Sequence, residues 1–266
     1  VFTFSSDGAA RVKESPAIMT EEQKASRFQE LGFSALYSVP FSSVREMEPE
    51  YFVSRVLKES LSAKRVCCGF NYRFGRDGKG DVKLLSQLCG KYSIELSVAP
   101  QVLWKGQTVS SSRIRQAISR GDMREALELL GRPFEIDFPV IKGNQIGRTL
   151  GTPTMNQALP PHFILPQFGV YATLVKIDGR EYHGVTNVGV KPTVGAQAPL
   201  SETWIPGYQG NLYGEKVPVF FLSFLRPEVK FESLELLRCQ ILEDGERAEE
   251  ILKNFQKGKK SFDSPC

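Results

Sequence analysis

The sequence predicts two domains: an α/β domain built on a parallel sheet, followed by a small antiparallel β-barrel with a C-terminal helix. Three observations support this fold class. In the first half, apolar runs typical of strands alternate with amphipathic helical patterns, as in a parallel sheet with helices on both faces. In the second half, strand runs follow one another through connections rich in Pro and Gly, as in a small barrel. The chain then closes with one long apolar stripe at helical spacing.

The elements of the first half are identified by the spacing of their apolar residues. Short apolar runs predict strands, and apolar residues three or four positions apart predict helices. The expected strands are residues 34–39, 65–70 and 94–98, and the expected helices are residues 49–61, 81–92, 110–119 and 123–130. Cys67 and Cys68 lie in the second of these strands, so we interpret them as small buried hydrophobic residues.

The elements of the second half are identified in the same way. The expected strands are residues 138–142, 169–177, 182–188 and 217–225. Asp178-Gly179 between two of these runs predicts a two-residue hairpin turn. Ser233 is expected to cap the last helix, and Gly245 is a position at which that helix could divide into two. The change of pattern after Leu130 predicts domains at residues 1–131 and 132–266.

The composition excludes several classes of protein. Hydrophobic residues make up 41% and charged residues 24%, as in ordinary globular proteins. A net charge of +4 without a dense basic patch argues against nucleic-acid binding. No apolar stretch approaches the roughly 20 residues that cross a bilayer, and the first residues do not resemble a signal peptide. The five cysteines include no CxxC pair, so we expect a cytoplasmic protein without disulfides or zinc.

The most informative segment is residues 143–156, Gly-Asn-Gln-Ile-Gly-Arg-Thr-Leu-Gly-Thr-Pro-Thr-Met-Asn. Its three glycines let backbone N–H groups approach a ligand closely, and Arg148 adds a cation able to face phosphate. The segment is not a P-loop, because no Gly-Lys-Ser/Thr follows at the required spacing. A plain turn is the alternative interpretation of the glycines.

The end of this segment offers two hard oxygen ligands. Pro153 favours extended backbone, so Thr154 and Asn156 are expected to point to the same side of the chain. A hydroxyl and an amide oxygen that converge in this way suit Mg²⁺, which takes one or two protein ligands together with waters and substrate phosphates. The alternative is that both side chains only stabilise a turn.

The same segment resembles the Gly-Arg-x-x-Gly-x-Pro-Thr-x-Asn signature of riboflavin kinases, and the resemblance continues in order through the second half. The further blocks are residues 169–171, 184–193, 202–205, 212–214 and 225–228, followed by the helix entry at Phe231. Two positions depart from the family pattern. Thr152 stands where a bulky residue is usual, and Trp204 stands where His is frequent.

This resemblance implies a small barrel of the riboflavin kinase type that uses Mg²⁺ and ATP to phosphorylate riboflavin to FMN. The residues implied in ATP binding are Gly143, Gly147, Arg148, Thr154 and Asn156. Glu202 would be the general base for the ribityl 5′-hydroxyl, because a carboxylate can accept its proton during attack on the γ-phosphate. Arg226 would lie in the loop that closes on the flavin. Without the resemblance, both residues would be interpreted as ordinary surface charges.

The first half resembles the adenylyltransferase half of the bacterial bifunctional riboflavin kinase/FMN adenylyltransferases, also called FAD synthetases. The matching blocks are Gly-Phe-Asn-Tyr-Arg-Phe-Gly at residues 69–75 and Val-Ser-Ser-Ser-Arg-Ile-Arg at residues 109–115. They imply a Rossmann-like nucleotidyltransferase domain that binds ATP phosphates at a helix N-terminus. The implied ATP-binding residues are Asn71, Ser111, Ser112 and Arg115. N-capping of a helix is the alternative role for the serines.

One element of that family is absent from the printed sequence. The family's first strand carries a His-x-Gly-His type motif, whereas the two histidines here, His162 and His183, both lie in the second half. Either the chain is a fragment of a longer protein, or its first domain has lost adenylyl transfer. A flavin- or nucleotide-binding regulatory protein without turnover is the alternative from another class. The Mg²⁺ ligands and the base argue against it, because binding alone needs neither.

The 266-residue chain is therefore expected to make FMN and to make FAD poorly or not at all. The histidine motif contacts the ATP phosphates during adenylyl transfer, so its absence affects the second reaction and not the first. Chromatography of the products formed from riboflavin and Mg-ATP measures both. Abundant FAD would contradict this expectation.

Overall fold

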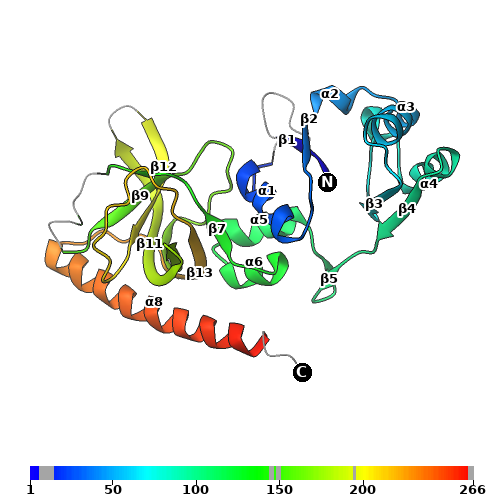
Figure 1. Ribbon diagram of the computed structural model, residues 1–266. Helices are drawn as coiled ribbons and strands as arrows, with labels where there is room; N and C mark the ends of the chain where they lie inside the picture. The colour runs from blue at the N-terminus through cyan, green and yellow to red at the C-terminus, as the bar shows by residue number, and fades with distance from the viewer. Residues whose placement is uncertain (6–14, 144–146, 148–150, 194–195, 263–266) are drawn as a thin grey trace. The chain divides into compact units, whose positions relative to one another are not determined.

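The computed structural model describes residues 1–5, 15–143, 147, 151–193 and 196–262 (Figure 1). The chain divides into two compact units. The first comprises Val1–Ser15 and Thr20–Val109, and the second comprises Pro16–Met19 and Ser110–Cys266. The boundary predicted between residues 131 and 132 falls inside the second unit, between a helix and the first barrel strand, and stays a prediction.

The first unit pairs its strands in parallel, as the alternating pattern predicts. The parallel pairs are β1 (Phe2–Ser5) with β2 (Tyr37–Pro40) and β3 (Arg65–Gly69) with β4 (Glu95–Ala99). Among the described residues these are separate two-stranded pairs, and β5 (Leu103–Trp104) with β6 (Gln107–Thr108) forms a short hairpin. The helices are α1 (Glu21–Glu30), α2 (Ser42–Arg45), α3 (Pro49–Tyr51), a π-helix (Phe52–Ser60), a 3₁₀ turn (Arg76–Gly78) and α4 (Val82–Lys91).

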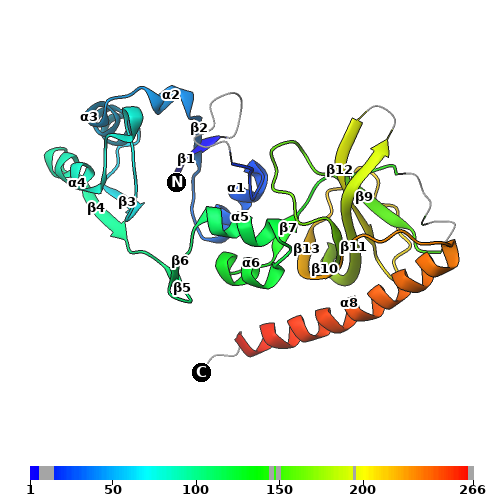
Figure 2. The same ribbon diagram turned by 180° about the vertical axis from the view of Figure 1, so that it is seen from behind.

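The core of the first unit lies between the π-helix, α4 and the β3–β4 pair (Figure 2). Phe52, Val53 and Leu57 from the π-helix pack with Leu85 and Leu88 from α4. The helix predicted over residues 49–61 is therefore present, but most of it is π-helical, with the Leu61 N–H donating to the Val56 carbonyl. Its apolar spacing reflects burial of one face, which both helix types allow.

The prediction that Cys67 and Cys68 are buried is wrong for Cys67, which is exposed. Neighbouring strand residues point to opposite faces of the sheet, so only one of the two can face the core. Cys68 is the half-buried one, and burial raises the pKa of its thiol. A continuous apolar run does not reveal which face of a two-stranded pair is covered.

The second unit contains a seven-stranded antiparallel sheet in the order β7-β13-β10-β11-β12-β9-β8 (Figures 1 and 2). The strands are β7 (Phe134–Ile136), β8 (Val140–Ile141), β9 (Thr154–Ala158), β10 (Gly169–Ile177), β11 (Arg180–Thr193), β12 (Ala196–Trp204) and β13 (Val219–Arg226). Asp178 and Gly179 form the predicted two-residue turn, both with positive φ as a type I′ hairpin requires. Two helices, α5 (Ser111–Ser119) and α6 (Met123–Leu130), precede the sheet.

The two edge strands of this sheet, β7 and β8, are consecutive in the chain, so the sheet must curl toward a barrel. Gln157 on β9 makes hydrogen bonds near the place where β7 and β8 approach each other. Its side chain is fully buried, and Nε2 donates to the Phe138 carbonyl at 2.6 Å and to the Val217 carbonyl at 2.9 Å. Phe138 lies between β7 and β8, and Val217 lies just before β13, so one amide connects three segments of the barrel.

The two faces of the curled sheet have different partners. Thr173, Thr186 and Thr203 lie inside on β10, β11 and β12, and their hydroxyls form a buried chain with oxygen–oxygen distances of 2.8 and 2.9 Å. The residues that alternate with them face the C-terminal helix α8 (Leu234–Phe262), which runs along β10, β11 and β13 (Figure 1). Val170 and Ala172 therefore pack with Ala248 of the helix.

Helix α8 begins as predicted, because Ser233 Oγ accepts a hydrogen bond from the Leu236 N–H at 3.2 Å. The possible break at Gly245 does not occur, since the helix is continuous from Leu234 to Phe262. A Cβ atom at Gly245 would lie 2.8 Å from the ring of Trp204. The glycine therefore allows the indole to pack closely against the helix, which costs about 1 kcal/mol of helix propensity relative to Ala.

Substitution Gln157→Leu is expected to destabilise the second unit by about 2–4 kcal/mol, because two buried carbonyls lose their donor while the volume is kept. Urea unfolding followed by circular dichroism measures this change. Gln256→Leu is the control, because Gln256 makes one exposed hydrogen bond to Glu181 and should change stability by less than about 0.5 kcal/mol. Equal stability of the two variants would show that the buried amide does not hold the barrel together.

Candidate functional site

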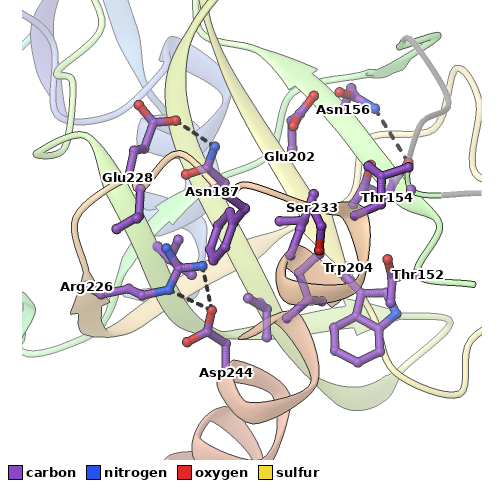
Figure 3. Close-up of a pocket in the computed structure, with 18 of the residues that line it drawn as sticks. Thr152, Thr154, Asn156, Asn187, Glu202, Trp204, Arg226, Glu228, Ser233 and Asp244 are labelled. Atoms are coloured by element: carbon purple, nitrogen blue, oxygen red, sulfur yellow. Dashed lines mark hydrogen bonds and ion pairs between the residues drawn. The ribbon is translucent and has the colours of Figure 1, made fainter. Parts of the chain in front are cut away.

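A cavity of about 560 Å³ lies between the outer face of the barrel and the first turns of α8 (Figure 3). Its walls come from β9 to β13, the segment between β13 and α8, and α8 itself. The lining residues are Gly147, Thr152, Thr154, Asn156, Val170, Val185, Asn187, Glu202, Trp204, Arg226, Glu228, Val229, Phe231, Glu232, Ser233, Leu234, Leu237, Ile241 and Asp244. This volume is typical of a small-molecule site.

The register of the sheet aligns three polar residues on the cavity wall. Asn156 on β9 lies directly opposite Glu202 on β12, and Glu202 lies directly opposite Asn187 on β11. Directly opposed residues have Cβ atoms about 4.5–5.5 Å apart and share one face of the sheet. Thr154, two residues before Asn156, faces the same cavity (Figure 3). A hydroxyl, an amide and a carboxylate therefore lie side by side on adjacent strands.

Two glycines of the predicted phosphate-covering loop lie close to this row. A Cβ atom at Gly143 would lie 2.5 Å from Asn156 Nδ2, so only glycine lets the backbone approach this amide. A Cβ atom at Gly147 would collide with the carbonyl oxygen of Thr152. The backbone N–H of Thr152 donates a hydrogen bond to the Gly147 carbonyl at 2.8 Å. Arg148 lies outside the described residues.

The residues on the β9 side fit a divalent cation. Asn156 is buried, and its Oδ1 has no hydrogen-bond partner in the described part of the chain; the same holds for the Thr152 hydroxyl. A buried acceptor without a partner costs free energy, which a bound cation or donor would recover. The exposed hydroxyl of Thr154 adds a third hard oxygen. The donor set thus has the chemistry that Mg²⁺ or a similar ion needs, with room for ligands from a substrate.

Arg226 connects the end of β13 to the helix. Its Nε and Nη2 donate to Asp244 Oδ2 at 2.9 and 2.8 Å, and Asp244 is fully buried on α8 (Figure 3). The guanidinium also lies 5.7 Å from the centre of the Phe231 ring. Breaking a buried ion pair on one side typically costs 3–5 kcal/mol, so Arg226 holds the helix as well as lining the cavity.

Much of the remaining cavity wall is apolar. The apolar residues there are Val170, Val185, Trp204, Val229, Phe231, Leu234, Leu237 and Ile241. Such a surface suits a flat aromatic group, whereas the row of polar residues suits hydroxyls, phosphates and a cation. The cavity can therefore hold a molecule with an aromatic end and a polar chain beside a phosphate donor.

The lining residues that were not predicted as site residues include Asn187, Trp204, Glu228 and Asp244, which carry amide, aromatic or charged groups. Trp204 could have been found, because it lies two residues after Glu202 on one strand and so shares its face. Asn187 lies opposite Glu202 only through the pairing of two strands, which the sequence does not give. Glu228 lies in a quoted block but gives no signal by itself. Asp244 is one acid among many on a charged helix, and no sequence signal shows its burial.

The residues expected to bind ATP in the first domain do not line this cavity. Ser111 and Ser112 are exposed in the first turn of α5, and Ser110 caps that helix by accepting from the Arg113 N–H at 3.3 Å. Arg115 donates to the Pro16 carbonyl at 2.6 Å, and burial lowers the pKa of its guanidinium. Asn71 is exposed after β3, in the other compact unit.

Family models match both halves of the chain. Residues 130–252 match the model for riboflavin kinase, and residues 1–113 match the model for FAD synthetase. The first match contains every residue of the cavity wall, so the site lies within a recognised enzyme domain. None of the described helices combines the length and the apolar character needed to cross a membrane.

Relatives match over most of the chain. The bifunctional riboflavin kinase/FMN adenylyltransferase of Listeria monocytogenes is 32% identical over 84% of this chain and 71% of the relative. That of Bacillus subtilis is also 32% identical, over 93% of this chain and 79% of the relative. A crystal structure described as a macrolide-efflux protein from Streptococcus pneumoniae is 30% identical with a TM-score of 0.82, covering 93% of this chain and 82% of that one. By these matches, the chain belongs to the bifunctional riboflavin kinase/FMN adenylyltransferase family.

Proposed function

We propose that the cavity between the barrel and α8 is where riboflavin is phosphorylated to FMN, with Mg²⁺-ATP as phosphoryl donor. The observation that carries the proposal is the direct opposition of Asn156 and Glu202 on adjacent strands that face one cavity. A cation ligand and a candidate base are thereby held next to each other. Membership of a family that works in flavin cofactor biosynthesis, uses ATP and in general needs a divalent metal agrees with this chemistry.

Glu202 is proposed as the general base. A primary alcohol is a weak nucleophile, and a carboxylate within hydrogen-bond reach accepts its proton as the oxygen attacks phosphorus. Glu202 is half-buried on β12 between two amide side chains, Asn156 and Asn187, which fix its surroundings. The alcohol therefore bonds to the γ-phosphorus while the bond from phosphorus to the leaving oxygen of ADP breaks.

Thr154 and Asn156 are proposed to hold Mg²⁺, and Gly143, Gly147 and Arg148 to cover the phosphates of ATP. Support comes from the exposed Thr154 hydroxyl, from the buried Asn156 Oδ1 and from the close approach of Gly143 to that amide. When bound, the ion would neutralise charge on the transferring phosphoryl group. Backbone N–H groups of the glycine-rich segment can donate to phosphate oxygens without steric hindrance.

Arg226 is proposed to lie at the flavin end of the site. Its guanidinium is held in place by Asp244 and lies beside Phe231, so the pair presents a fixed, partly aromatic surface. Phe231, Trp204 and the neighbouring aliphatic residues can enclose the isoalloxazine ring.

The proposed domain assignment follows the two family matches. Residues 132–266 are proposed as the riboflavin kinase domain and residues 1–131 as a Rossmann-like domain related to FMN adenylyltransferases. Within the latter, Asn71, Ser111, Ser112 and Arg115 are proposed ATP-binding residues. Support comes from the two family matches and from the exposed serines in the first turn of α5, where a helix N-terminus favours anions.

Substitution Glu202→Ala is expected to lower kcat for FMN formation by roughly 10²–10⁴-fold, the usual contribution of a positioned acid or base. Glu202→Gln keeps the size of the side chain and should show a similar loss, since the amide cannot accept the proton. Flavin affinity, measured by fluorescence quenching, should stay near that of the original protein. Near-normal turnover in either variant would remove Glu202 from the mechanism.

Substitution Thr154→Ala is expected to weaken the use of Mg-ATP more than the binding of riboflavin. Thr154 lines the cavity two residues before Asn156, on the strand proposed to hold the metal ion. The KM for Mg-ATP should therefore rise, and raising the Mg²⁺ concentration should restore part of the rate, while the flavin Kd changes little. A larger effect on flavin affinity than on Mg-ATP use would mean that the segment is misassigned.

A further inference from the structure

Glu228 is one of the carboxylates on the cavity wall, and the proposed reaction gives it no role. Glu228 follows the end of β13 by two residues and lines the cavity on the side away from Asn156. Its Oε1 accepts a hydrogen bond from Asn187 Nδ2 at 2.9 Å (Figure 3). The side chain is exposed, so a ligand in the cavity can reach it.

The position of this carboxylate is built into strand β11. Asn187 and Gly189 are two residues apart on that strand and so lie on the same face. A Cβ atom at Gly189 would lie 2.5 Å from Glu228 Oε1, and 3.1 Å from Oε2. The absence of a side chain at Gly189 thus leaves room for the Glu228 carboxylate, and the Asn187 amide donates a hydrogen bond to that carboxylate.

The Glu228 carboxylate and the Asn187 side-chain oxygen offer hydrogen-bond acceptors to a ligand. An ionised carboxylate accepts only, so Asn187 must present its NH₂ to Glu228 and keep its oxygen as an acceptor. That Oδ1 is buried without a partner in the described part of the chain. Glu202, an acceptor as well, lies directly opposite Asn187 on the next strand. This side of the cavity therefore favours ligands that donate hydrogen bonds, such as hydroxyl groups, and disfavours phosphate oxygens.

The order of strands in the sheet indicates the direction in which the polyol chain of the substrate extends across the cavity wall. Asn156, Glu202 and Asn187 lie on β9, β12 and β11, which are neighbours in the sheet at a spacing of about 4.8 Å. If the phosphates bind beside Asn156 and the reacting alcohol meets Glu202, the chain carrying that alcohol must extend toward Asn187 and Glu228. The next hydroxyls of a polyol chain would then reach the Glu228 carboxylate.

We propose that Glu228 accepts hydrogen bonds from secondary hydroxyls of the substrate's polyol chain, and that Asn187 positions it. The pair makes the enzyme selective for a polyol over a simple primary alcohol attached to the same ring. This inference rests on the proposed function, because it assumes that the alcohol reacts at Glu202.

The test compares two substrates: riboflavin, and a flavin whose ribityl chain is replaced by a 5-hydroxypentyl chain, which keeps only the reacting hydroxyl. Glu228→Ala is expected to lower kcat/KM for riboflavin by about 10- to 100-fold, the loss of a hydrogen bond to a charged group, and to change that for the analogue by less than about threefold. Asn187→Ala should show the same pattern with a smaller loss. Glu228→Gln, which keeps an acceptor for Asn187, should fall between the original protein and Glu228→Ala.

The matched control is Glu181→Ala, which removes an amide-to-carboxylate hydrogen bond of 3.0 Å between Gln256 and β11, outside the cavity. It should change neither substrate's kcat/KM. Equal losses on both substrates in the Glu228 variants would overturn the inference and indicate a structural role. If the original protein makes no FMN, the proposed function fails instead. Binding measurements then test the role of Glu228 independently of turnover, because Glu228→Ala should weaken affinity for riboflavin and not for the hydroxypentyl flavin.

Discussion

The pairing of β12 with β9 on one side and β11 on the other is the constraint on which the site depends. Because side chains alternate between faces, a slip of one residue would turn Glu202 into the barrel and bring Thr203 out. The buried hydroxyl chain of Thr173, Thr186 and Thr203 opposes such a slip, since in this register each of the three hydroxyls has a hydrogen-bond partner inside the barrel. The hydrogen bonds among the buried threonines thus stabilise the register that places Asn156, Glu202 and Asn187 on the cavity wall.

The second wall of the site is a helix, and its attachment explains several residues that carry no reaction chemistry. Asp244 is fully buried, and burial of its charge is tolerated because Arg226 pairs with it. Gly245, one residue later, lets Trp204 pack against the same turn of α8. The ion pair and the indole therefore set the distance between helix and sheet, and with it the width of the cavity.

Much of the fold could be predicted from the sequence, because local chemistry decides it. Asp178-Gly179 forms the expected hairpin, and Ser110 and Ser233 cap the helices expected after them. The strands that were predicted lie close to observed ones, whereas β5, β6, β7 and β12 were not predicted. Local spacing paired Thr154 with Asn156, and the resemblance to a family added Glu202; the register brings these three side chains to one cavity. Spacing along the chain could relate Thr154 to Asn156, but not either of them to Glu202.

Other features depend on contacts between distant segments. The sequence by itself determined most of the element types, the turn at residues 178–179, the caps and the glycine-rich segment, since each follows from residues within a few positions of one another. Only the tertiary structure decided that Cys67 is exposed, that Gly245 lies inside a continuous helix, that Asp244 is buried against Arg226, and that Glu228 sits on Asn187 and Gly189. The physical reason is that burial and hydrogen-bond partners depend on which surfaces meet, and those surfaces come from residues tens of positions apart.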